Sequence, residues 1–80
     1  MTNQEQRTLT FGEQAAGVSF NPSKDPFVDE IKGLYATIID KLDAARTTAG
    51  RGEKGRYFSK AISEAEDSQM NAVKAITWQY

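Results

Sequence analysis

The most constraining feature of this sequence is a run of apolar residues that recurs at alternating spacings of three and four. Its members are Val28, Ile31, Tyr35, Ile38, Leu42, Ala45 and Ala49. This repeat places the side chains along one side of a helix, which is how a helix packs lengthwise against another helix. The sequence therefore predicts an all-α fold in which a long helix pairs with a second one.

The predicted first long helix has clear ends. Asp25 can cap it, Pro26 suits its first position, and Gly50 suits its termination after Ala49. Gly33 lies inside the helix, where glycine costs about 1 kcal/mol relative to alanine. We therefore expect Gly33 to mark a close backbone contact.

A second long helix is predicted from about residue 55 to residue 77, after a short turn rich in glycine. Its apolar positions are Phe58, Ala61, Ile62, Ala65, Met70, Ala72, Val73 and Ile76, with Gln69 interrupting the stripe. A connection this short makes neighbouring helices antiparallel. We expect an antiparallel helical hairpin over residues 17–80, preceded by residues 1–16 as a flexible arm or a short helix.

The length of the chain favours self-association. A single core of 80 residues supplies only about 3–5 kcal/mol of net stability unless it is cross-linked. Cysteine and histidine are both absent, which removes disulfides and the usual zinc and copper ligands. The sequence therefore predicts a homo-oligomer.

Composition also limits the chemistry and the partners. Without histidine or cysteine the chain has no imidazole base and no thiol nucleophile, so we expect no enzyme and no cofactor. A net charge of −1 disfavours DNA, RNA and anionic membranes. No apolar run approaches the roughly 20 residues that span a bilayer, and no signal peptide is evident, so a cytoplasmic location is expected.

Four cations gather in the turn and at the start of the second long helix. They are Arg51, Lys54, Arg56 and Lys60. Cations at a helix N-terminus oppose the macrodipole, so they favour an anion there, and Arg56 with Ser59 and the first backbone N–H groups can form a phosphate cradle. The alternative is a solvated basic turn in which Lys60 pairs with Glu64.

Phe20 precedes a rigid turn and a helix start. It can stack on a nucleobase, an interaction of roughly 1–3 kcal/mol, or it can plug the hydrophobic core. Lys32, taken alone, is an ordinary solvated lysine on the polar flank of the helix. Trp78 and Tyr80 are expected to seal an interface.

Two pairs of carboxylates are spaced by three residues and could approach a hard metal ion. They are Asp40 with Asp43 and Glu64 with Asp67. Two carboxylates without further ligands make a weak site, so no metal is predicted.

Four segments together resemble a known family. They are residues 17–23 (GVSFNPS), 29–32 (DEIK), 52–63 (GEKGRYFSKAIS) and 69–75 (QMNAVKA). Over residues 17–78 the chain is similar to the phage anti-CBASS sponges, whose hairpin domain also occurs in Thoeris anti-defence sponges. Phe20 stands where tyrosine is frequent in that family, and Asn71 stands where a tryptophan often follows the methionine.

The resemblance implies a homohexamer of helical hairpins that sequesters cyclic oligonucleotide second messengers without cleaving them. It would act in the host cytoplasm during infection and block CBASS antiphage signalling. Phe20 would stack on a base of a cyclic dinucleotide, and Lys32 would contact its phosphate. Arg56, Ser59 and Ser63 would contact a cyclic trinucleotide near a three-fold axis.

Two other readings of the chain stay open. In the first, the hairpin is a structural or adaptor protein that only mediates assembly and has no nucleotide ligand. In the second, it is a metal-dependent nuclease or phosphodiesterase, which the thin set of ligands disfavours.

Overall fold

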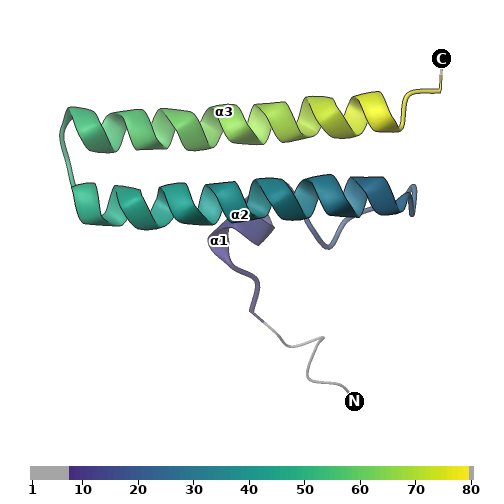
Figure 1. Cartoon of the computed structure of the whole chain (residues 1–80), viewed down its shortest axis with the longest axis horizontal. Coiled ribbons are helices and arrows are strands. Elements are labelled where there is room, and N and C mark those ends of the chain that lie inside the picture. The colour runs from purple at the N-terminus through teal and green to yellow at the C-terminus, as the bar shows by residue number, and fades with distance from the viewer. Residues whose placement is uncertain (1–7, 80) are drawn as a thin grey trace.

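The computed structural model describes residues 8–79, which form three helices (Figure 1). α1 spans Phe11–Ala16, α2 spans Pro26–Ala49 and α3 spans Glu53–Ile76. α2 and α3 run antiparallel side by side, and α1 packs mainly against α2. The all-α class and the antiparallel hairpin are confirmed. Residues 1–7 of the predicted arm, and Tyr80, lie outside the described residues.

α2 begins and ends as the sequence predicts. Asp25 is the N-cap, and its carboxylate accepts a hydrogen bond of 2.9 Å from the backbone N–H of Phe27. Pro26 occupies the first turn, where its missing N–H leaves no gap in the hydrogen bonding. The last helical residue is Ala49, and Gly50 follows it as the C-cap.

α3 begins at Glu53, two residues before the predicted start at Gly55. The Glu53 carboxylate lies in the first turn, where it complements the helix dipole, and it pairs with Arg56 one turn later. Gly55 is needed inside the helix because a Cβ atom there would lie 2.1 Å from the carbonyl oxygen of Gly50. The turn between the long helices is therefore tighter than the glycine pattern suggested.

α1 is fixed to α2 at a close contact. A Cβ atom on Gly12 would lie 2.2 Å from the carbonyl oxygen of Ala36, so only glycine fits. The Asp40 carboxylate accepts hydrogen bonds of 2.7 Å from the Gly12 N–H and from the Thr10 hydroxyl. The predicted close contact at Gly33 is wrong, because nothing lies within 4 Å of the position a Cβ would take there.

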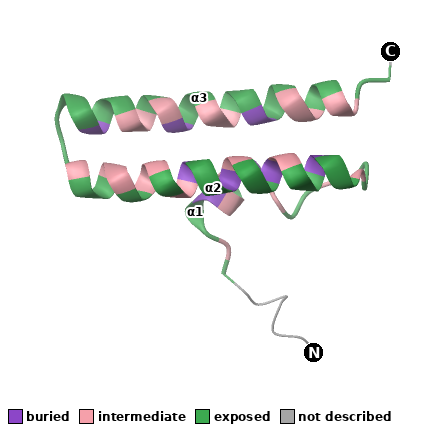
Figure 2. Ribbon diagram, in the orientation of Figure 1, coloured by how far each residue is buried: buried purple, intermediate pink, exposed green. Residues whose placement is uncertain are grey.

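The buried face of α2 differs from the predicted run. Its buried residues are Val28, Lys32, Ala36 and Ile39 (Figure 2). Ile38, a member of the predicted run, is 49% exposed. α1 covers the strip around Ala36, whereas Tyr35 faces α3 and shares a hydrogen bond with the Ser68 hydroxyl. Since two helices pack on α2, its buried strip extends from the side that faces α3, where Val28 lies, to the side that α1 covers, where Ala36 lies.

α3 packs lengthwise against α2 through residues that are seven apart. Gly55, Ile62 and Gln69 are its buried residues, and this spacing is that of a helix seam. From the sequence, Gln69 was expected to interrupt the apolar stripe of this helix. In the structure only 5% of Gln69 is exposed, and it lies within the seam.

The three helices form a single thin layer. Along its shortest axis the chain is 12 Å across, measured between Cα atoms, so each face of the hairpin is open. Large apolar side chains remain exposed on that layer: Phe11, Phe20, Phe27, Leu34, Ile38, Tyr57, Met70 and Trp78. Within residues 8–79 no helix is both long and apolar enough to cross a lipid bilayer.

Candidate functional site

A groove lies where the start of α2 meets the end of α3. We call it the Phe20 groove. It is lined by Phe20, Asn21, Pro22, Ser23, Val28, Lys32, Val73, Lys74, Thr77, Trp78 and Gln79, and its volume is about 590 Å³. This volume lies within the range of about 300–1,000 Å³ that small-molecule sites occupy.

The turn before α2 is built by its own hydrogen bonds. The Asn21 amide group donates to the carbonyl oxygen of Asp25 and to the Asp29 carboxylate, both at 3.0 Å. Its carbonyl oxygen accepts from the Ser23 hydroxyl at 2.6 Å and from the Lys24 N–H at 3.1 Å. These bonds hold Lys24 at a φ of 60°, which non-glycine residues seldom adopt. The turn therefore presents Phe20 from a fixed backbone.

Phe20 is 68% exposed, and its ring lines the Phe20 groove. Within one chain, therefore, it does not plug the hydrophobic core. The ring offers a flat apolar face to a ligand in the groove.

Lys32 is buried, contrary to the interpretation of it as a solvated lysine. Only 5% of it is exposed, and its ammonium donates to the carbonyl oxygen of Gly17 at 3.0 Å and to that of Phe20. The ammonium nitrogen also lies 5.5 Å from the centre of the Phe20 ring. The Gly17 carbonyl oxygen also accepts a hydrogen bond of 3.0 Å from the Phe20 N–H, so Lys32 adds to a turn that is already closed by its backbone. Lys32 thus ties α2 to the segment that carries Phe20.

Two further residues of the groove, Lys74 and Trp78, were not among the site residues predicted from the sequence. Lys74 lies near the end of α3, and Trp78, which had been assigned to an interface, follows the helix. An antiparallel hairpin brings the end of α3, and the residues that follow it, beside the start of α2. The predicted hairpin, together with a cation and an aromatic residue at that end of the chain, could have found them.

Arg56 forms a surface ion pair. Its guanidinium donates to the Glu53 carboxylate at 2.8 and 3.2 Å, and its central carbon lies 4.6 Å from the Tyr57 ring centre. The hydrogen bond with Arg56 lowers the pKa of Glu53, and the same bond raises the pKa of Arg56. Lys60 pairs with Glu64 at 3.4 Å, as the solvated-turn alternative predicts.

Ser59 and Ser63 share a helix face with Arg56 but do not form a cavity with it in one chain. The Ser59 hydroxyl accepts a hydrogen bond of 3.2 Å from Arg46, and Ser63 is exposed. A second cavity of about 320 Å³ lies nearby and is lined by Leu42, Lys54, Tyr57, Phe58 and Ala61. Neither it nor the Phe20 groove includes any of the three predicted residues.

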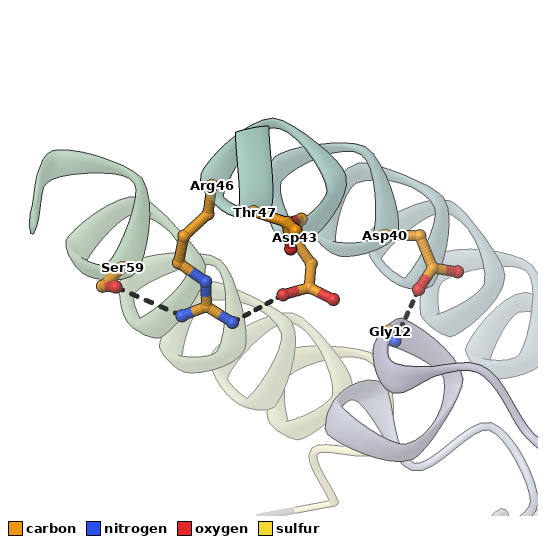
Figure 3. Close-up of polar contacts among 6 residues, drawn as sticks. All are labelled: Gly12, Asp40, Asp43, Arg46, Thr47 and Ser59. Carbon is orange, nitrogen blue, oxygen red and sulfur yellow. Dashed lines mark hydrogen bonds and ion pairs between the residues drawn. The ribbon is translucent and has the colours of Figure 1, made fainter. Parts of the chain in front are cut away.

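Arg46 links all three helices (Figure 3). One of its terminal nitrogens lies 2.6 Å from the Asp43 carboxylate and another donates to Ser59. Its central carbon lies 5.6 Å from the centre of the Phe11 ring. Nothing in the sequence distinguishes Arg46, because a lone arginine near a helix C-terminus has an ordinary capping role.

The carboxylates that were considered as metal ligands have other partners. Asp40 accepts hydrogen bonds from the start of α1, and Asp43 pairs with Arg46. Within residues 8–79 no cluster of three or more acidic side chains is placed to hold a metal ion.

The Phe20 groove fits a flat, anionic ligand. It is lined by two aromatic residues, Phe20 and Trp78, and by two lysines, and the chain has no histidine or cysteine. Such a set can stack on bases and bind phosphate. Comparisons with protein-family models, with curated proteins and with solved structures find no match for this chain. Its function is therefore inferred from the residues and their geometry.

Proposed function

We propose that this protein binds and sequesters cyclic oligonucleotide second messengers without cleaving them. The observation that carries the proposal is the Phe20 groove, where an exposed aromatic ring and a buried lysine from different segments line one cavity. A cyclic dinucleotide is a compact dianion with two flat bases, so aromatic faces and cations suit it. No catalytic group is needed for sequestration.

In this proposal the protein acts as a homo-oligomer, and the resemblance to the anti-CBASS sponges implies a hexamer. The thin layer of helices supports assembly, because a second copy would cover apolar side chains that one copy leaves exposed. In this proposal Phe20 and Lys32 bind a cyclic dinucleotide, and Arg56, Ser59 and Ser63 from several copies bind a cyclic trinucleotide. By removing these messengers in the host cytoplasm, the protein would block CBASS signalling.

Isothermal titration calorimetry with cyclic di-AMP and cyclic tri-AMP tests the proposal directly. We expect saturable heat with at least one of them. Chromatography of the ligand after denaturation of the complex should return it intact. Absence of binding to both compounds would contradict the proposal, and recovery of linear products would indicate an enzyme instead.

The competing function is that of a structural or adaptor protein with no nucleotide ligand. The exposed side chains Phe27, Leu34 and Ile38 on α2 favour it, because they form an apolar face that could bind another protein chain without any nucleotide. An adaptor would assemble but produce no heat with either nucleotide.

A further inference from the structure

Resting on the proposed function, we infer that Lys74 and Trp78 complete the dinucleotide site, Lys74 as its exposed phosphate-binding cation and Trp78 as its second stacking surface. Both line the Phe20 groove from the end of α3. The segment before α2 then supplies the first aromatic ring, Phe20, and Lys32 of α2 holds that segment in place. The end of α3 supplies the second ring and the second cation.

A second cation beside Lys32 is required, because most of the hydrogen-bonding capacity of Lys32 is used within the protein. An ammonium group has three N–H donors, and Lys32 directs two of them to the carbonyl oxygens of Gly17 and Phe20. A cyclic dinucleotide carries two negatively charged phosphates, whereas Lys32 has a single positive charge and one N–H donor left to bind them. Lys32 is therefore chiefly a positioning residue that holds Phe20.

Lys74 is the other cation among the residues that line the groove. It is exposed, and its side chain has no ion pair with any acidic residue between positions 8 and 79. By contrast, Arg46, Arg56 and Lys60 each pair with a carboxylate. Lys74 can meet a phosphate without first breaking an ion pair.

Trp78 supplies a second aromatic face from outside the helix. It is 57% exposed and follows Thr77, which closes α3 by donating its hydroxyl and its N–H to the carbonyl oxygen of Val73 at 2.9 and 3.0 Å. The Trp78 N–H in turn lies 3.3 Å from the Ala75 carbonyl oxygen. These bonds fix the backbone that presents the indole at the groove. Two bases of one ligand then meet two rings of the protein.

Trp78 is the single tryptophan of the chain, so its fluorescence reports on this groove directly. We would titrate the full chain with cyclic di-AMP, following tryptophan emission and calorimetric heat in parallel. The variants are Lys74→Met, which keeps the length of the side chain, Lys74→Arg, Trp78→Ala and Trp78→Phe. Lys60→Met is the matched control, because Lys60 is exposed on α3 but does not line the groove.

We expect saturable quenching of Trp78 in the wild type, and binding weakened about tenfold or more in Lys74→Met and in Trp78→Ala. Lys74→Arg, Trp78→Phe and Lys60→Met should retain most of the affinity. Salt should weaken the wild type more than Lys74→Met, because the lost contact is ionic, while Trp78→Ala should keep the wild-type salt dependence. A merely structural role for Lys74 would leave the salt dependence unchanged.

Two outcomes overturn the inference in distinguishable ways. If the wild type binds cyclic di-AMP and both Lys74→Met and Trp78→Ala bind it equally well, Lys74 and Trp78 are not part of the site, although the proposed function stands. If the wild type binds neither cyclic di-AMP nor cyclic tri-AMP while remaining folded, the proposed function fails and this inference falls with it.

Discussion

Lys32 and Phe20 act as one unit, because the lysine ammonium donates to the Phe20 carbonyl oxygen and lies beside its ring. A stacking residue is effective only if its ring is held in place before the ligand arrives. The hydrogen bonds of Asn21 fix the turn on one side of Phe20, and Lys32 fixes the other. Single substitutions in this unit therefore separate the loss of a contact from the loss of its position.

Phe20→Ala should weaken binding of cyclic di-AMP by roughly tenfold, since it removes a stacking surface of about 1–3 kcal/mol. Calorimetry measures the affinity, and circular dichroism should show unchanged helicity because the ring is exposed. Phe27→Ala is the control, since Phe27 is also exposed but does not line the groove. Equal losses in the two variants would refute the assignment of Phe20.

Lys32→Ala should weaken dinucleotide binding and also lower the stability of the fold. It removes the Lys32 ammonium from the carbonyl oxygens of Gly17 and Phe20, and the Gly17 oxygen keeps only its bond from the Phe20 N–H, at a cost of about 1–3 kcal/mol. Thermal unfolding of the protein without ligand measures the second effect. A variant that loses affinity with no change in melting temperature would indicate that Lys32 is only a ligand contact.

Arg56→Ala should weaken binding of cyclic tri-AMP by roughly tenfold or more and leave cyclic di-AMP binding unchanged. Equal losses of both ligands in calorimetry would argue against two separate sites.

Glu53→Gln should have the opposite effect on cyclic tri-AMP, because the Glu53 carboxylate holds the Arg56 guanidinium and would compete with the proposed ligand for it. The pKa of Glu53 is lowered by that bond, so the pair is intact at neutral pH and opens as the pH falls through the lowered value. Trinucleotide affinity should therefore rise on acidification in the wild type and not in Glu53→Gln. Glu64→Gln is the control, because it disrupts the separate pair with Lys60.

The helices differ in how they are attached. α2 and α3 pair along their whole length, whereas α1 has six residues and is joined to α2 through Gly12, Asp40 and the Lys32 contacts. A helix this short has little stability of its own. The position of α1, and with it the backbone of Gly17 that Lys32 binds, depends on these few contacts.

Gly12→Ala should destabilise the fold by roughly 1–3 kcal/mol, because the new methyl group would meet the Ala36 carbonyl oxygen. Gly33→Ala should instead stabilise it by about 0.5–1 kcal/mol, since the space there is open and alanine is the better helix former. Urea unfolding of the two variants measures both effects. Similar destabilisation in both would show that α1 does not pack as described.

The whole molecule is a thin layer with apolar residues on its open faces, which is why assembly is proposed. Two neighbouring isoleucines on α2 allow folding and assembly to be tested separately. Ile39 is fully buried, while Ile38 is 49% exposed. The sequence alone assigned Ile38 to the helix seam, and the structure assigns the buried position to Ile39.

Ile38→Asp should dissociate the oligomer while the chain stays helical, because the charge falls on an open face. Ile39→Asp should unfold the chain, because a buried unpaired carboxylate is strongly unfavourable. Native mass spectrometry and circular dichroism report the two properties. If Ile38→Asp keeps the wild-type mass, this face of α2 does not form the interface.

The sequence by itself determined the helices, because their signals are local. Asp25, Pro26 and Gly50 set the ends of α2, and the apolar repeat sets its length. The sequence also indicated Phe20 as a residue presented by a rigid turn. These features depend on residues that are close together in the sequence, so caps, turns and helical periodicity are enough to predict them.

The tertiary structure alone decided which faces are buried and which distant residues share a site. One apolar repeat cannot show that α2 has two neighbours, so it could not distinguish Ile38 from Ile39 or reveal the close contact at Gly12. Nor could it show that Lys32 is buried, since the carbonyl groups that bind it lie 12 and 15 residues earlier in the chain. Lys74 and Trp78 meet Phe20 only because the hairpin closes. Burial and the composition of a site depend on contacts between segments, and local sequence patterns do not encode them.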